Sequence, residues 1–329
     1  MKNHFNGTNS SIKIFSFFII YYPLILIILG TILNLLTFII LCRTTFKNAR
    51  KRPTIHYMRT IAIFDILILY GWNLDQYLER TIGIKMTNYS VISCKIFTFL
   101  NYFIYHVSAW LRVFICFDRY LSLSRLHRTW FSISKNVLIL ISFLMLSFIL
   151  LNLHIFPFVC YYENDQVNIE SRYYTIYPMW DRVNLIIYNC LPFSFMIIFN
   201  SGIIYHLILL RRISTVRKTS RIQHRSISIT LLLTTCLFFL MTTPVSIAYA
   251  YFSHRNEHIL YALDSILYTY HILGFPVYFL TFREFRREFF KLITLYNCRK
   301  CKNLSTIHHD TPIKNVVNHL FIISDTSLK

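Results

Sequence analysis

The chain has 329 residues, of which 55% are hydrophobic, 17% aromatic and only 15% charged. About a quarter of the residues in a soluble protein are charged, so the composition excludes an ordinary soluble domain. The formal net charge of +20 is spread over alternate loops, which argues against a nucleic-acid partner and for a membrane topology with anionic lipid nearby.

Seven apolar stretches follow one another along the chain. Each is long enough as a helix to cross a hydrocarbon core about 30 Å thick, which takes about 20 residues. They lie near 14–41, 54–78, 93–120, 134–156, 182–210, 223–252 and 258–281. Transmembrane strands are excluded, because strands alternate lipid-facing and lumen-facing residues. The expected fold class is an all-α membrane protein with a seven-transmembrane helix bundle.

Membrane helices tolerate the prolines that we expect to bend three of these stretches, Pro192, Pro244 and Pro276. The expected domain organisation is an N-terminal segment at 1–14, a bundle at 15–281, a surface helix at 282–297 and a tail at 298–329. The surface helix is amphipathic, because Phe282, Phe285, Phe289 and Ile293 recur at helical spacing. A soluble tail helix is the alternative.

The basic loops alternate with loops of mixed charge. Arginine and lysine concentrate at 43–52, 125–135, 211–225 and 283–291. The positive-inside rule then places the N-terminus outside and the C-terminus inside, in a multi-pass protein of the plasma membrane. The first apolar run is expected to stay as a signal anchor. Three sequons fall outside and are candidate glycosylation sites: Asn6, Asn9 and Asn88.

Two of the eight cysteines, Cys94 and Cys160, are expected near the outer face, where an oxidising exterior would let them pair; two unpaired thiols are the alternative. Cys298 and Cys301 follow the basic surface helix and are either palmitoylated or plain reduced thiols. Zinc would need two more ligands, and the sequence offers only His308 and His309. We therefore expect no metal and no cofactor.

Ionisable residues inside apolar spans are functional candidates, because burying a charge in a membrane is unfavourable. The chain has few of them, and those we single out are Asp65, Arg112, Asp118, Arg119 and Asp264. Asp118 and Arg119 are adjacent at the cytoplasmic end of the third span, where they neutralise each other.

The chain resembles the rhodopsin-class G-protein-coupled receptors over about residues 15–297. The family's Asp-Arg-Tyr signature corresponds to Asp118-Arg119-Tyr120, and Cys94 stands 25 residues before the arginine, as the family's disulfide cysteine does. The resemblance implies that Cys94 and Cys160 form a disulfide and that the signature couples to a heterotrimeric G protein. Other matching positions are Asn34, Asp65, Pro192 and Pro244.

Several positions depart from the family pattern. The fourth helix lacks the family's tryptophan. The sixth-helix motif is Met241-Thr242-Thr243-Pro244 without the tryptophan, although Phe238 is kept. Asn200 replaces the fifth-helix tyrosine, and the seventh-helix motif is shifted so that Pro276 precedes Tyr278 by two residues. His224 stands where an acid would pair with Arg119, which predicts a weak inactive-state latch and some basal activity.

Arg112 lies two turns before Arg119, where the family usually has an aliphatic residue. Asp65 is expected at a similar depth on the neighbouring helix, and an unpaired charge there is unfavourable. We therefore predict an ion pair between Arg112 and Asp65 in the pocket where the family usually binds sodium. The alternative is that Arg112 reaches backbone carbonyls or water.

The resemblance also bears on the ligand. Asn101 occupies the position of the amine receptors' aspartate, and the seventh span has no lysine for retinal. Acids and aromatics in the outer half favour a short peptide with a basic or amidated aromatic end, as in invertebrate neuropeptide receptors of the FMRFamide-receptor-like kind. The candidate contacts are Asp75, Glu79, Asn101, Tyr102, Tyr105, Trp180, Asp264, Tyr268 and His271.

Other function classes remain as alternatives. An environmental chemosensory receptor would share the fold. A transporter would need paired broken helices around a midplane site, which the sequence does not indicate. An enzyme is not expected, because there is no His-Glu-x-x-His motif and the aspartates are not paired.

Overall fold

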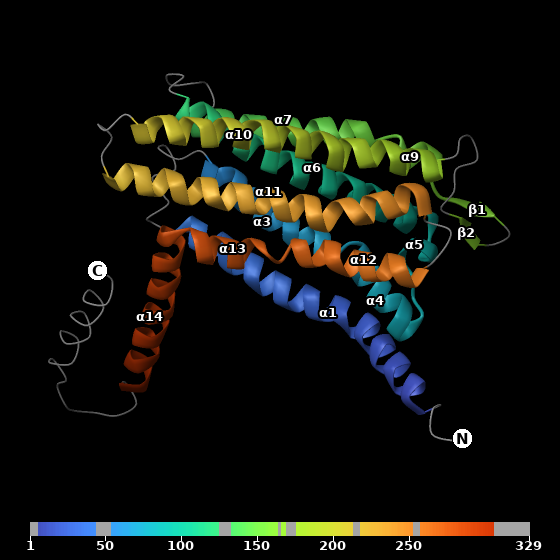
Figure 1. The fold of residues 1–329 in the computed structure, drawn as a ribbon. Coiled ribbons are helices and arrows are strands. Elements are labelled where there is room, and N and C mark those ends of the chain that lie inside the picture. Colours follow the sequence, from blue (N-terminus) through green and yellow to red (C-terminus); the bar gives the residue numbers. More distant parts are fainter. Residues whose placement is uncertain are drawn as a thin grey trace. The chain divides into compact units, whose positions relative to one another are not determined.

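The computed structural model describes residues 6–43, 54–124, 133–163, 166–168, 176–212, 218–252 and 257–305. It divides into two compact units, Met1–Arg286 and Arg287–Lys329. Nearly all of this described chain is helical, as the composition predicts, and its one sheet is a two-stranded hairpin (Figure 1).

Five helices in the described part are long and apolar enough to cross a membrane. Three spans lie within single helices: Ile20–Cys42 in α1 (Asn6–Cys42), Val91–Leu123, which is α6, and Ser228–Phe252 in α11 (Lys218–Phe252). The span Ser134–Phe158 covers α7 (Ser134–Asn152) and α8 (Ile155–Phe158). The span Met179–Leu209 runs through α9 (Ile176–Asn184), η3 (Leu185–Cys190) and α10 (Leu191–Arg212). The chain is therefore an all-α membrane protein, as predicted. α1 begins at Asn6, earlier than the expected start at 14.

The other two expected spans are interrupted. The stretch at 54–78 forms α3 (Thr54–Leu69) and α4 (Trp72–Ile82), and the stretch at 258–281 forms α12 (Glu257–Tyr270) and α13 (Gly274–Thr281). Each piece is shorter than a membrane crossing requires. The structure therefore shows five of the seven expected spans, and the other two stretches are interrupted helices.

Both breaks have a local cause. At the first, Gly71 turns the backbone between α3 and α4, and Asn101 of α6 accepts a hydrogen bond from the Trp72 amide at 3.3 Å. A Cβ atom at position 71 would lie 2.5 Å from the Asn101 Oδ1, so any other residue there would displace the Asn101 side chain. At the second, three successive amides from His271 bond three residues back, which tightens the helix before Pro276 removes a further donor.

α6 (Val91–Leu123) is the central helix of the first unit and packs against α3, α7 and α10. α1 packs on α3, and α11 lies between α10 and α12. Ser90 caps α6 by accepting a hydrogen bond from the Ser93 amide at 3.0 Å.

One end of the bundle is fixed by a disulfide between Cys94, the fourth residue of α6, and Cys160. The prediction of this pair is confirmed. Cys160 leads directly into the antiparallel hairpin of β1 (Tyr161–Glu163) and β2 (Gln166–Asn168), in which Tyr162 faces Val167. The short helix α5 (Met86–Tyr89) also packs at this end, which we call the disulfide end; it lies at the right of Figure 1.

The last helix, α14 (Arg283–Ser305), runs from the first unit into the second. Within the second unit Lys291 pairs with Glu288 at 2.9 Å. α14 starts where the amphipathic helix was expected and continues past 297.

Candidate functional site

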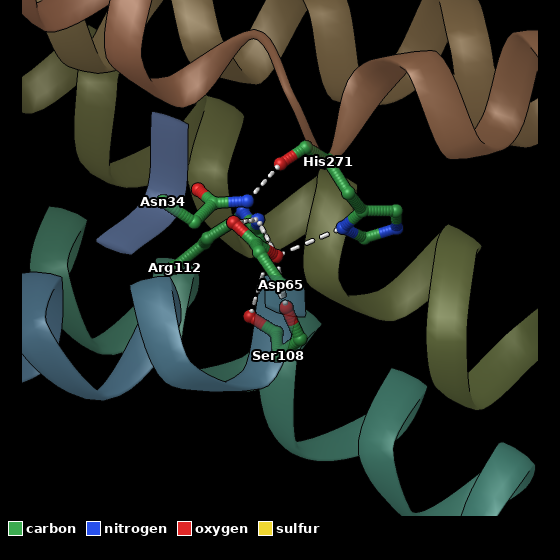
Figure 2. Close-up of polar contacts among 5 residues, drawn as sticks. All are labelled: Asn34, Asp65, Ser108, Arg112 and His271. Atoms are coloured by element: carbon green, nitrogen blue, oxygen red, sulfur yellow. Dashed lines mark hydrogen bonds and ion pairs between the residues drawn. The ribbon is translucent and has the colours of Figure 1, made fainter. Parts of the chain in front are cut away.

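Asp65 lies at the centre of a buried polar cluster, and its side chain is 3% exposed (Figure 2). The Arg112 Nη2 atom donates to both carboxylate oxygens of Asp65, at 2.8 and 2.9 Å. The ion pair predicted from the sequence is therefore present. Arg112 also donates through Nη1 to the Ser108 carbonyl at 2.9 Å. It therefore combines the predicted ion pair with the alternative, a hydrogen bond to a backbone carbonyl. A doubly hydrogen-bonded pair of this kind offsets the loss of hydration of both charges.

The break between α12 and α13 supplies the third partner of Asp65. His271 lies in the break, and its Nδ1 atom is 2.8 Å from Asp65 Oδ1. The Asn34 amide of α1 donates to the His271 carbonyl at 3.0 Å, which satisfies a backbone group that the broken helix leaves open. Figure 2 shows these side chains converging on Asp65. His271 was expected in the ligand pocket, but it belongs to this cluster, which ties α1, α3, α6 and the break together.

Asp264 of α12 is as buried as Asp65, at 2% exposed, but its hydrogen-bond partners are different. Its Oδ2 atom accepts hydrogen bonds from Gln76 Nε2 and from the Tyr249 hydroxyl, both at 2.7 Å. Both donors are neutral. Among the described residues Asp264 forms no ion pair within 4.0 Å, and its Oδ1 atom accepts no hydrogen bond. Sequence reasoning identified Asp264 but not Gln76 or Tyr249, which carry no charge to mark them.

Arg80, whose charge acts on Asp264, packs against an aromatic ring. The guanidinium carbon of Arg80 lies 3.7 Å from the centre of the Tyr261 ring, one turn before Asp264 on α12. A cation over an aromatic face is stabilised by the ring quadrupole. Arg80 therefore packs on an aromatic ring beside Asp264 and forms no ion pair within 4.0 Å of its carboxylate, although its charge acts on Asp264 from a longer distance.

The Asp118-Arg119-Tyr120 end of α6 is organised by Thr54, the first residue of α3. The Thr54 hydroxyl donates to Asp118 Oδ2, and Arg119 Nη2 donates to the Thr54 oxygen. The Tyr120 ring packs against position 202, where an added Cβ would lie 2.5 Å from its Cε2 atom. Gly202 thus lets α10 approach this end of α6.

A cavity of about 50 Å³, part of it open to the outside, is lined by both Arg119 and Arg112. Its other polar lining comes from Thr54, Thr230, Thr234 and Tyr278, and the rest of the lining is mostly aliphatic. No carboxylate lines it among the residues that the structure describes. The Tyr278 ring also contacts Phe285 at 5.9 Å between centroids, beside the start of α14.

Several expected ligand contacts have structural roles. Asp75 is 1% exposed and accepts a hydrogen bond from the Met86 amide at 2.6 Å, so it anchors α5. Asn101 stabilises the start of α4, as described above. Tyr102 donates to Asp181 at 3.0 Å. Tyr105 contacts the His271 ring at 5.8 Å, and Tyr268 is 2% exposed.

A further polar cluster was not anticipated. Asn189 lies in η3, a π-helical segment just before Pro192. It donates to Ser246 at 2.6 Å and accepts from Thr242 and Thr243 at 3.1 and 2.9 Å. These three partners flank Pro244 in α11, so Asn189 joins the π-helical segment to the proline bend. The sequence signal is the polar run Thr242-Thr243 at the position of the missing tryptophan.

The predicted modification sites are only partly described. Asn88 is exposed in α5, as a glycosylation acceptor must be. Asn6 and Asn9 lie in α1, His224 in α11 and Cys298 and Cys301 in α14, but their side chains fall outside the described ones. His308 and His309 lie outside the described residues. No cluster of metal-ligating residues occurs among the described side chains.

Comparison with known proteins yields no match, either to a protein-family profile or to a curated protein sequence.

Proposed function

We propose that this chain is a seven-helix receptor of the rhodopsin class that transduces an extracellular ligand, a short peptide, into activation of a heterotrimeric G protein. In this reading α3–α4 and α12–α13 are the two bent spans that complete the seven, and the start of α14 is the amphipathic eighth helix. The observation that carries the proposal is the cavity between Arg119 and Arg112. Arg119 of the Asp118-Arg119-Tyr120 signature lines it, and a partner's backbone carbonyls that entered it would meet this guanidinium.

The ends of the bundle support the same reading. The disulfide and the hairpin are at the first turn of α6, and the Asp118-Arg119-Tyr120 signature is near the last turn of the same helix. A receptor needs such a division, because ligand binding on one side must change contacts on the other.

The test is a calcium response in cells that express the chain with a promiscuous G protein, challenged with a panel of amidated peptides. A peptide response that Arg119→Ala abolishes at equal surface expression supports the proposal. Arg182→Ala is the matched control, because Arg182 lies in α9, where its guanidinium carbon is 5.3 Å from the centre of the Tyr251 ring. A response that survives Arg119→Ala contradicts the coupling role.

The two interrupted helices favour one other class of function, a secondary transporter. Transporters bind substrate where discontinuous helices expose backbone groups near the membrane midplane. Here the backbone group of one break is already bonded, since Asn34 donates to the His271 carbonyl. Substrate uptake into proteoliposomes without any G protein would support the transporter over the receptor.

A further inference from the structure

Asp264 and Asp65 are both buried carboxylates, but only Asp65 has a cationic partner. An ionised group in a membrane interior is unfavourable unless it is paired and hydrogen-bonded. The two hydrogen bonds from Gln76 and Tyr249 orient the Asp264 carboxylate and occupy Oδ2, and they supply no charge. Among the described residues Asp264 therefore has no direct ion pair, and the charge of Arg80 acts on it only from beyond 4.0 Å.

We propose that Asp264 Oδ1 is the anchor for an ammonium group of the ligand. This deepens the proposed function and rests on it for the side from which the ligand enters. Oδ2 already accepts two hydrogen bonds from neutral donors, which leaves Oδ1 as the oxygen without one among the described residues. A compact cation suits that single oxygen, and a primary ammonium is compact and can direct any one of its three N–H groups to it.

The surroundings of Asp264 add an aromatic component. Tyr249 contacts the carboxylate directly, and Tyr268, 2% exposed, lies one helical turn after it. Tyr261, one turn before it, already holds the Arg80 guanidinium over its ring. Carboxylate and ring faces together favour an organic cation over a hydrated metal ion. Asp264 lies seven residues into α12, about 10 Å along the helix from its first residue, which is within reach of a short peptide.

The experiment measures binding to the purified full-length chain in lipid nanodiscs, with phenethylammonium as the probe and 2-phenylethanol as its neutral counterpart. We expect saturable binding of the ammonium probe, with the alcohol weaker by at least about tenfold, as a hydrogen bond to a charged group predicts. Asp264→Asn should abolish the difference. Asp75→Asn is the matched control, because Asp75 is equally buried but bonds to the Met86 amide.

Three results would overturn the proposal: no saturable binding of the ammonium probe, equal binding of probe and alcohol, or unchanged binding in Asp264→Asn. A fourth concerns Arg80. If Arg80→Gln lowers the unfolding temperature of the wild type and raises that of Asp264→Asn, then Arg80 is the counter-ion and no ligand is needed. Failure of the proposed function is distinguishable, because it would leave ammonium binding intact and remove only the calcium response.

Discussion

Asp65 and Asp264 are equally buried, yet their surroundings differ in one respect. Asp65 accepts hydrogen bonds from both a cation and a polar side chain, so its charge is compensated within the protein. Asp264 accepts only from a neutral amide and a phenol. The first arrangement compensates the charge within the fold, and we propose that the second leaves Asp264 for a ligand. The difference teaches that burial alone does not describe a buried acid, because the charge of its hydrogen-bond donors also differs.

The largest effect is expected from separating Asp65 and Arg112. Asp65→Asn leaves a buried guanidinium uncompensated, which costs about 3–5 kcal/mol of unfolding free energy. The double variant Asp65→Asn, Arg112→Met should regain most of that loss, because it removes both charges. Thermal unfolding of the two variants in the same nanodiscs measures this. Additive losses in the double variant would mean that the two residues act independently.

The Asn189 cluster is expected to have the next largest effect. Asn189→Leu removes three hydrogen bonds between η3 and α11, and it leaves buried hydroxyls of Thr242 and Thr243 with fewer partners. We expect a loss of about 2 kcal/mol and a rise in ligand-independent signalling, since the proline bend is released. Ser194→Ala is the control, because Ser194 bonds only to its own helix. Unchanged basal signalling in Asn189→Leu would mean that the Asn189 cluster stabilises the fold and does not control signalling.

Arg112 also predicts how the protein responds to sodium. Its guanidinium is hydrogen-bonded to both oxygens of Asp65, the carboxylate that a bound sodium ion would need as a ligand. Ligand affinity should therefore not change when sodium replaces a large organic cation at constant ionic strength. Radioligand or fluorescent-peptide binding in both salts measures this. A specific sodium effect would show that the pair opens to admit the ion.

A smaller effect is expected at the break between α3 and α4. Asn101→Ala removes the acceptor of the Trp72 amide, so we expect a loss of about 1 kcal/mol. If Asn101 contacts the ligand directly, affinity would fall more than stability does. Parallel measurement of unfolding temperature and peptide affinity separates the two roles.

Hydropathy predicted the helical membrane fold because long apolar runs have few other solutions. It did not predict the breaks at Gly71 and His271, which depend on one tight glycine contact and on turns with three-residue spacing. A break changes which face the following residues present. Asp75 and His271 were expected to face the ligand. Instead, Asp75 accepts a hydrogen bond from the Met86 amide, and His271 contacts Asp65.

The Asp65–Arg112 pair was predictable because two buried charges of opposite sign at one depth have one favourable arrangement. The partners of Asp264 were not predictable in this way. Gln76 and Tyr249 are common neutral residues, and only their positions in space make them hydrogen-bond donors to the carboxylate. The hydroxyl partners of Asn189 around Pro244 were missed for the same reason.

The most direct test compares Asp65→Asn with Asp264→Asn by thermal unfolding in identical nanodiscs without ligand. Both changes are isosteric and remove one buried charge. The account predicts opposite directions: Asp65→Asn lowers the unfolding temperature by several degrees, and Asp264→Asn leaves it unchanged or raises it, since it removes a charge that has no partner. Equal destabilisation by both variants would contradict the account, because Asp264 would then be as fully compensated within the fold as Asp65.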